Sequence, residues 1–259
     1  MAGIIGELLT DIRIAVTFLT RLPIRPMETV HPEQLLRAQR VLPLVGALIG
    51  CAVGLAYAGL TAIGAPALAS AAVALGIGAL ITGALHEDGL ADMADGFGGG
   101  RDKESKLEIM RDSRLGTYGA LVTIVSFTVK ASALSTLSGF VAVAGLAACH
   151  ALARGGLSAL ALSLPFARKD GLAATAGRPS FATAVTSALL ALAIALIALP
   201  WRVALVASLG AMLSVVAVRS LARRQIGGQT GDVLGAAEQI AEAVILLSLA
   251  TLLAGVHEF

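Results

Sequence analysis

The chain has 259 residues, of which 57% are hydrophobic and only 14% are charged. Soluble domains carry roughly 25% charged residues. Together with a mean hydropathy of +0.86, the composition therefore excludes an ordinary soluble protein and indicates a polytopic membrane protein. The net charge of +2 is spread over the chain rather than gathered in a basic stripe, so no nucleic-acid partner is expected. Cys51 and Cys149 both lie in apolar runs, where burial rather than a disulfide or zinc site is expected.

Residues 1–22 predict an amphipathic helix rather than a cleaved signal peptide. Apolar residues recur there at helical spacing, and Glu7, Asp11 and Arg13 interrupt the apolar run. Such a helix is expected to lie at the membrane interface or against the bundle. Prolines from Pro23 to Pro32 then end it.

Seven further segments are apolar and long enough to cross a bilayer. They cover residues 41–63, 66–85, 115–137, 139–164, 181–199, 203–221 and 232–256. The first contains Gly46, Gly50 and Gly54, a spacing of small residues that lets another helix approach closely. We therefore predict an all-α fold: a polytopic transmembrane helix bundle of about seven spans plus the N-terminal amphipathic helix, as one domain over residues 1–259.

The basic residues predict the orientation of these spans. Apart from Lys130, Arg154 and Arg202, the 19 Lys and Arg lie before the first span or around the connections after the second, fourth and sixth. An excess of Lys and Arg marks cytoplasmic connections. The sequence thus predicts a multi-pass protein of the cell (inner) membrane, with the lipid bilayer as a partner and the polar loops and active site facing the cytoplasm.

The most polar stretch is residues 86–116, which follows the second span. Asp88, Asp92 and Asp95 are spaced i, i+4 and i+7 there, so a helix would place the three carboxylates on one face. Like charges so arranged repel each other, and a hard divalent cation such as Mg²⁺ would turn this repulsion into attraction. A solvated acidic helix end is the alternative interpretation.

Glycines and basic residues follow these carboxylates. The run from Gly96 to Gly100 predicts a flexible or tightly turned backbone, which could approach phosphate oxygens. Basic residues come after it, among them Arg101, Lys103, Arg111 and Arg114. Carboxylates for a metal and arginines for phosphates together indicate phosphoryl transfer. Asp112 lies among these arginines, directly before the next span.

Ionisable residues also occur within the predicted spans, where they are functional candidates by default. His150 and Arg154 are one helical turn apart. Arg154 could reach a phosphate or pair with an acid, while His150 is either a general base or bonded to a neighbouring helix. Lys130 lies deeper in its span and could snorkel or pair structurally.

The last span begins at another acidic position. Thr230 suits a helix cap, with Asp232 in the first turn. Glu238 and Glu242 follow at i, i+4 in the same helix and need a cation, an arginine or a shared proton. The two glutamates could be a second set of metal ligands or could pair with Arg154, and the sequence leaves both interpretations open.

Short strings in order along essentially the whole chain resemble the cobalamin synthase family, the adenosylcobinamide-GDP ribazoletransferases. The strings are FLTRLP at 18–23, HEDGLAD at 86–92, DG at 95–96, MRDS at 110–113, GTYG at 116–119, HALAR at 150–154 and GD at 231–232. The acidic string is the most specific of them. Glu87 departs from the family pattern, in which an apolar residue is more usual, and it adds a carboxylate.

The resemblance implies a Mg²⁺-dependent integral membrane transferase that performs the last step of cobalamin nucleotide-loop assembly. It would join adenosylcobinamide-GDP to α-ribazole, or its 5′-phosphate, and release GMP. Carried onto this chain, the expected metal ligands are Asp88, Asp92, Asp95 and Glu87. The expected catalytic groups are Asp92, Asp95 and His150. The expected substrate- or phosphate-binding residues are Arg101, Arg111, Arg114, Arg154, Asp112 and Asp232. The family also makes a homo-oligomer, or a complex with other enzymes of nucleotide-loop assembly, an open expectation.

Two other classes of protein share part of this pattern. A membrane CDP-alcohol phosphotransferase also presents an aspartate-rich helix end, and Asp92-x2-Asp95-Gly96 matches the start of its motif, but the later twin aspartates do not follow in order. A transporter could use His150, Arg154, Glu238 and Glu242 as an intramembrane pathway. The chain shows no clear internal repeat, and its acids cluster on one face rather than along the midplane, which argues against a transporter.

Overall fold

The computed structural model describes residues 2–24, 27, 29–168, 174 and 177–253. Apart from one isolated β-bridge between Phe166 and Gln229, the regular structure of these residues is helical, as predicted. The elements, in order, are α1 Ala2–Leu19, α2 Pro32–Ala38, a 3-10 turn Gln39–Val41, α3 Leu42–Ala62, α4 Ala67–Thr82, α5 Leu85–Gly99, α6 Lys103–Ile109, α7 Thr117–Leu134, α8 Gly139–Gly155, α9 Leu157–Ser163, α11 Phe181–Ala198, α12 Trp201–Ile226 and α13 Gly231–Leu253.

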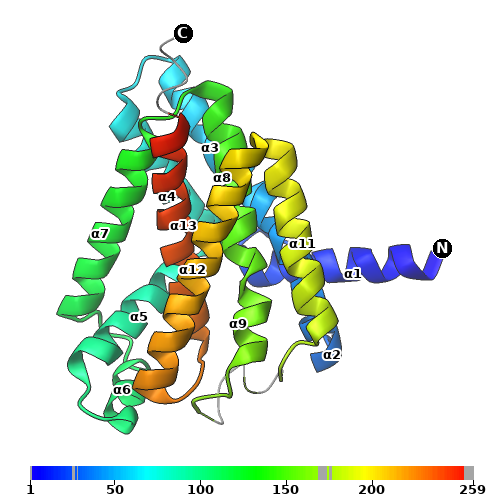
Figure 1. Cartoon of the computed structure of the whole chain (residues 1–259), viewed down its shortest axis with the longest axis vertical. Helices are drawn as coiled ribbons and strands as arrows, with labels where there is room; N and C mark the ends of the chain where they lie inside the picture. Colours follow the sequence, from blue (N-terminus) through cyan, green and yellow to red (C-terminus); the bar gives the residue numbers. More distant parts are fainter. Residues whose placement is uncertain (1, 25–26, 28, 169–173, 175–176, 254–259) are drawn as a thin grey trace.

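The predicted spans correspond to helices of this bundle (Figure 1). Within the described residues six helical segments are long and apolar enough to cross a membrane, and a seventh span results if the bent pair α4 and α5 is counted as one. The fourth predicted span is divided at Gly156 into α8 and α9. The predicted end of the last span, residues 254–256, lies outside the described part of the chain.

The chain bends by 93° between α4 and α5. The bend is made by Gly83 and Ala84, whose φ angles of 66° and 54° both lie in the left-handed region. Glycine reaches this region without steric cost, whereas alanine does not. The backbone N–H of Arg21 donates to the carbonyl oxygen of Ile81, 2.7 Å away, and so ties the chain after α1 to the end of α4. The direction of the acidic helix α5 is therefore set by this bend and differs by 93° from that of α4.

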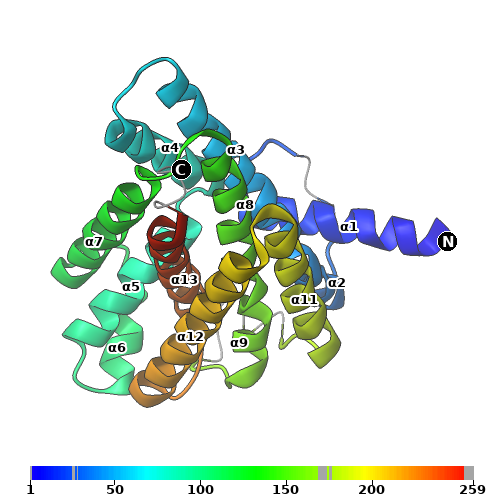
Figure 2. The same cartoon turned by 45° about the horizontal axis from the view of Figure 1, so that its top comes forward.

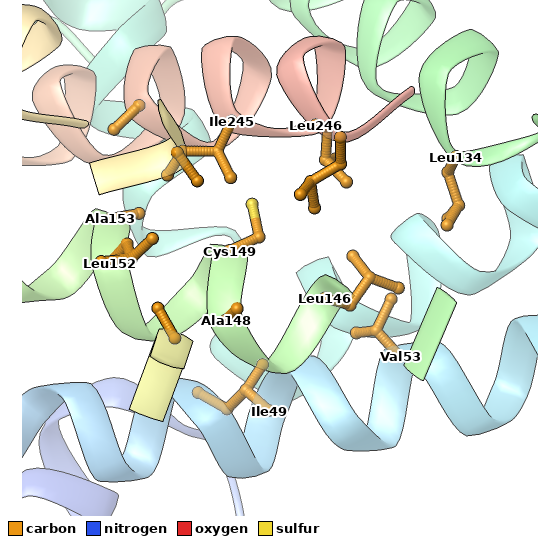
Figure 3. Close-up of a cluster of buried hydrophobic side chains, with 14 of the residues drawn as sticks. Ile49, Val53, Leu134, Leu146, Ala148, Cys149, Leu152, Ala153, Ile245 and Leu246 are labelled. Atoms are coloured by element: carbon orange, nitrogen blue, oxygen red, sulfur yellow. The ribbon is translucent and has the colours of Figure 1, made fainter. Parts of the chain in front are cut away.

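The closest helix contact in the bundle joins α3 and α8. A Cβ added at Gly46, Gly50 or Gly54 would lie under 3.0 Å from backbone atoms of α8. The predicted role of these small residues is thus confirmed, because any larger side chain would separate the two helices. Around this contact, Val53, Leu146, Cys149 and Ile245 belong to a core built mainly by α3, α8 and α13 (Figure 3).

Helix α1 projects sideways from the bundle, with the N-terminus at its far end (Figures 1 and 2). The half of α1 next to the bundle is packed, with Ala15 and Leu19 buried, whereas Ile5 and Leu9 in the projecting half are exposed. Asp11 is fully buried and pairs with Arg37 and Arg40 at 3.0 and 2.8 Å. This ion pair anchors α1 to the start of the first span.

Candidate active site and the buried ion cluster

Helix α5 carries the predicted carboxylate face and packs between α13 and α7 (Figure 1). Along this face Asp88 is exposed, Asp92 is half-buried and Asp95 is buried. The helical placement of the three aspartates is therefore as predicted. Their solvent access differs, however, because the start of α7 covers the carboxylate of Asp95.

Asp232, on the first turn of α13, lies beside this face. A Cβ added at Gly89 would lie 3.1 Å from the Cα of Asp232, and one added at Gly235 would lie 3.2 Å from the Cα of His86. These two glycines let α5 and α13 approach to backbone contact. The charged groups that act electrostatically on Asp92 are three carboxylates and one base: Asp88, Asp232, Asp95 and Arg168. Arg168 also lies 3.7 Å from a carboxylate oxygen of Asp232.

Asp95 has a structural role that the sequence did not reveal. Its two carboxylate oxygens accept hydrogen bonds of 2.8 Å from the backbone N–H groups of Gly116 and Gly119. These donors lie at the start of α7, where N–H groups have no partner within the helix. Asp95 thus caps α7 and holds it to α5. Its predicted roles as a metal ligand and catalytic group stay predictions.

The donor set on this face fits a hard divalent cation. The carboxylates of Asp88 and Asp92 have no hydrogen-bond or ion-pair partner among the described residues, and they offer oxygens, which Mg²⁺ prefers. The oxygens of Asp88, Asp92 and Asp232 do not all lie within 4.8 Å of one another in the described part of the chain. A closed set of three protein ligands is not required, because Mg²⁺ in phosphoryl-transfer sites is commonly bound by one or two carboxylates plus substrate phosphates.

Glu87 points away from the aspartate face. It lines a small internal cavity together with His86, Lys130 and Glu242, and its buried Oε2 atom has no hydrogen-bond partner. The structure thus separates Glu87 from Asp88 and Asp92, with which it was grouped on the sequence. Its predicted role as a metal ligand stays a prediction.

The glycine run is not the open loop that the sequence predicted. Residues Gly96 to Gly99 belong to α5, and their φ angles are not in the left-handed region. A Cβ added at Gly96, Gly98 or Gly100 would lie under 3.0 Å from Met110, Tyr118 or Lys106, respectively. The glycines therefore serve close packing of α5 against α6 and α7. The physical reason for the error is that a helix tolerates glycine where neighbouring elements leave no room for a side chain.

The predicted phosphate-binding residues divide into an exposed and a buried group. Arg101, Arg111 and Arg114 are exposed in the segments that flank α6. Arg114 pairs with Asp112, with 2.5 Å between Nη2 and Oδ2, and its hydrogen bonds lower the pKa of Asp112 to about 2. Asp112 is therefore ionised at neutral pH and holds Arg114 in the loop before α7.

Arg154 belongs to the buried group and is only 1% exposed. Its Nη1 atom lies 2.5 Å from Glu238 and 3.2 Å from Glu242. Of the two roles open to Arg154 on the sequence, pairing with an acid is the one observed. The guanidinium is thus engaged by carboxylates of α13 in this structure, away from the exposed arginines.

Six ionisable residues from four helices form what we call the buried ion cluster: His86 of α5, Lys130 of α7, His150 and Arg154 of α8, and Glu238 and Glu242 of α13. His150 Nδ1 lies 2.8 Å from Glu242, and Lys130 Nζ lies 3.2 Å from the other oxygen of the same carboxylate. His86 Nδ1 lies 3.6 Å from Glu238. Sequence reasoning found five of these residues but missed the part of His86, whose only signal is its place two residues before Asp88.

Chemically, the exposed end of this arrangement combines carboxylates that can hold a cation with arginines that can bind phosphates. The acidic face of α5, the start of α13 and the segment around α6 lie toward the same end of the molecule (Figure 1). The buried ion cluster lies behind it, inside the bundle. The residues expected from the sequence therefore fall into an exposed group at this end, which we call the candidate reaction face, and a buried group behind it.

Comparison with known proteins assigns the chain to a family. The family model described as cobalamin-5-phosphate synthase matches residues 11–250. An adenosylcobinamide-GDP ribazoletransferase of Bradyrhizobium diazoefficiens is 45% identical over 249 residues, covering 94% of each chain. Proteins of the same name from Sinorhizobium medicae and Rhizobium etli are each 43% identical, covering 95% and 96% of this chain and 98% and 99% of theirs.

No solved structure matches this chain. The family assignment consequently comes from the sequence matches, which extend over nearly the full length of the chain and of its relatives. The matched region includes α5, the segment around α6 and the start of α13. The chain belongs to the cobalamin-5-phosphate synthase family.

Proposed function

We propose that this protein is an adenosylcobinamide-GDP ribazoletransferase. It transfers the adenosylcobinamide-phosphate group of adenosylcobinamide-GDP to α-ribazole, or to α-ribazole 5′-phosphate, and releases GMP. The observation that carries this proposal is the near-full-length identity of 45% to a relative of that name. The same relatives give no support to the CDP-alcohol phosphotransferase and transporter alternatives.

The reaction exchanges a phosphoanhydride bond for a phosphate ester bond. The ribazole hydroxyl oxygen forms a bond to the phosphorus next to cobinamide, and the bond from that phosphorus to the bridging oxygen breaks, so GMP leaves with the bridging oxygen. The hydroxyl proton must be accepted by a base. Asp92 is better suited than His150, because it is half-buried on the reaction face whereas His150 is enclosed in the buried ion cluster.

The metal proposal assigns Mg²⁺ to Asp88 and Asp92, with Asp232 as the carboxylate facing them from α13. When bound, Mg²⁺ neutralises negative charge on the pyrophosphate. Asp95 orients this face by holding α7 against α5. Arg101, Arg111 and Arg114 bind the outer phosphate oxygens, for which the planar guanidinium is suited.

The proposed location is the inner membrane, with the reaction face toward the cytoplasm. The support is the distribution of Lys and Arg, which gather around the connections at the end of the bundle that carries α6. We keep a homo-oligomer, or a complex with other enzymes of nucleotide-loop assembly, as a proposal that rests on the family alone.

The test of this function is GMP release by the purified protein, given adenosylcobinamide-GDP and α-ribazole with and without Mg²⁺. We expect metal-dependent GMP release coupled to formation of the joined corrinoid. Asp92→Asn should reduce the rate by about 100-fold or more, since it removes both the base and a ligand charge. Glu104→Gln, which changes an exposed acid on α6, serves as the matched control and should keep the rate. A folded protein that releases no GMP would contradict the proposal.

A further inference from the structure

The two glutamates of the buried ion cluster already have basic partners. Glu238 pairs with Arg154, and Glu242 pairs with Lys130 and lies 2.8 Å from His150. His150, Glu238 and Glu242 have ligand atoms within 4.8 Å of one another, but the carboxylate oxygens are engaged by these bases. The cluster is therefore a set of ion pairs in which Arg154 and Lys130 take the place that a metal cation would have.

The cluster joins α13 to the first turn of α5. His86 Nδ1 lies 3.6 Å from Glu238 Oε2 and 3.5 Å from Nη2 of Arg154. Two residues after His86 comes Asp88, and six residues before Glu238 comes Asp232. Helices α5 and α13 thus carry both the buried ion cluster and, a few residues away along each helix, the facing carboxylates Asp88 and Asp232.

Near these residues the two helices are in backbone contact. The contact is made by Gly89 and Gly235, where added Cβ atoms would lie 3.1 and 3.2 Å from the opposite helix. A glycine contact brings helices close but sets neither their rotation nor their sliding. An ion pair or hydrogen bond between specified atoms does, because only one register satisfies both partners.

The start of α5 is not oriented by α4, because it follows a 93° bend at Gly83 and Ala84. At the other end of α5, Asp95 fixes the helix to α7. The contact of His86 with Arg154 adds a polar contact at the end of α5 where Asp88 lies.

We propose that the buried ion cluster acts, through His86, as a positioning device that holds Asp88 and Asp92 in register with Asp232 for cation binding. His86 and Glu238 are positioning residues in this arrangement and do not contact the substrate. The inference rests on the proposed function, because it assumes that the carboxylate face binds a divalent cation. It assigns a role to a set of residues that the reaction itself does not use.

The test compares two substitutions of His86 by their affinity for Mn²⁺, a paramagnetic substitute for Mg²⁺. An asparagine amide can occupy the place of the imidazole Nδ1 atom, so His86→Asn should retain the contact, whereas His86→Leu removes it. Binding is measured on the purified full-length protein without substrate, from the electron paramagnetic resonance signal of free Mn²⁺. Residues that orient metal ligands typically contribute about 10- to 100-fold to metal affinity. We expect a loss of about 10-fold in His86→Leu and near wild-type affinity in His86→Asn.

A kinetic measurement adds a second readout. The Mg²⁺ concentration for half-maximal GMP release should rise in His86→Leu by a similar factor, with a maximal rate at saturating Mg²⁺ that stays within about threefold of wild type. Glu238→Gln removes, at nearly constant volume, the charge that holds Arg154 beside His86 and should reproduce the same shift. If His86→Leu does not fold, Glu238→Gln provides the test instead.

Asp11→Asn is the matched control, since Asp11 belongs to another buried ion pair, between α1 and α2, away from α5. It should lower thermal stability without changing the affinity for Mn²⁺. Unchanged Mn²⁺ affinity in His86→Leu and Glu238→Gln, with normal binding by the wild type, overturns the positioning role alone. A wild-type protein that binds no Mn²⁺ and releases GMP without metal overturns the metal site of the proposed function as well.

Discussion

At the scale of single residues, Asp92 and Asp95 show why equal spacing does not mean equal role. Both were predicted on one helical face, and both lie there. Asp95 is buried and satisfied by two backbone N–H groups, while Asp92 has no such partner among the described residues. The sequence contained the donors of these hydrogen bonds, in the GTYG string, but residues 21 and 24 positions apart cannot be paired from spacing alone.

Substitution of Asp95 should therefore affect stability in a way that substitution of Asp92 does not. In Asp95→Asn one carboxylate oxygen becomes an amide NH₂, which cannot accept from the N–H of Gly116 or Gly119. The unsatisfied buried donor costs about 1–3 kcal/mol. We expect a lower melting temperature of the detergent-solubilised protein for Asp95→Asn and an unchanged one for Asp92→Asn. Equal melting temperatures for the two variants would contradict the capping role.

Arg154 is the residue whose removal should destabilise the bundle most among the charged groups discussed. Arg154→Met leaves Glu238 and Glu242 with Lys130 as the remaining permanent cation of the cluster. Breaking one side of a buried ion pair costs about 3–5 kcal/mol, because the other charge stays buried. The double variant Arg154→Met with Glu238→Met removes one positive and one negative charge together. Its free energy of unfolding should therefore recover most of the loss seen in Arg154→Met. Thermal unfolding monitored by circular dichroism measures both variants, and no recovery in the double variant argues against charge imbalance as the cause.

At the scale of elements, the sequence predicted the apolar helices well because a long charge-free run has few other stable forms in a bilayer. It failed at α5, where Gly96 to Gly100 indicated a loop but the chain is helical to Gly99. The information that decides this is the size of the neighbours, Met110 and Tyr118, which lie against the glycines. Such tertiary contacts have no local signal in the sequence.

The bend between α4 and α5 offers a test of backbone strain. Ala84 is the only non-glycine residue with positive φ in the described part of the chain. The left-handed region costs a residue with a side chain about 1–2 kcal/mol relative to glycine. Ala84→Gly should raise the melting temperature, and Ala84→Val should lower it. GMP release measured at saturating Mg²⁺ checks that neither change alters the reaction face; a lower melting temperature for Ala84→Gly would contradict this account of the bend.

The contact of α3 with α8 gives a second prediction with a control on the same helix. An added methyl group at Gly50 would meet the backbone of Leu146, so Gly50→Ala should destabilise the bundle by about 1–3 kcal/mol. At Gly59 an added Cβ meets nothing within 4 Å, so Gly59→Ala should be neutral or stabilise by about 0.5–1 kcal/mol. Thermal melts of the two variants in the same detergent compare them directly. Similar behaviour of both would show that the glycine spacing is not a packing feature.

At the scale of the whole molecule, composition and hydropathy sufficed to predict a membrane bundle, and the helices agree with it. What they did not predict is that the second span, α4, is followed after a 93° bend by a polar helix, α5, that packs against α13 and α7. Charge patterns led to a description of residues 86–116 as one polar segment. The structure divides this segment between a helix in the bundle, the short helix α6 and the loop before α7.

The orientation of the molecule in the membrane is open to a direct test. Lys103 and Arg202 lie at opposite ends of the bundle, near α6 and at the start of α12. In a variant with Cys51 and Cys149 replaced by Ala, a cysteine at position 202 should react with a membrane-impermeant thiol reagent in intact cells. A cysteine at position 103 should react only after the membrane is opened. The reverse pattern would place the reaction face outside the cytoplasm.

The shortness of α4 has a consequence for the surrounding lipid. Its 16 residues rise about 24 Å at 1.5 Å per residue, which is less than the roughly 30 Å of a typical hydrocarbon core. The bilayer must thin beside α4, or the first polar turn of α5 must sit below the headgroups, and each accommodation costs free energy that grows with the mismatch. Lipid acyl-chain length is therefore expected to affect the enzyme. A thinner bilayer matches the length of α4, whereas a thicker one strains the bend between α4 and α5, which sets the direction of the acidic helix.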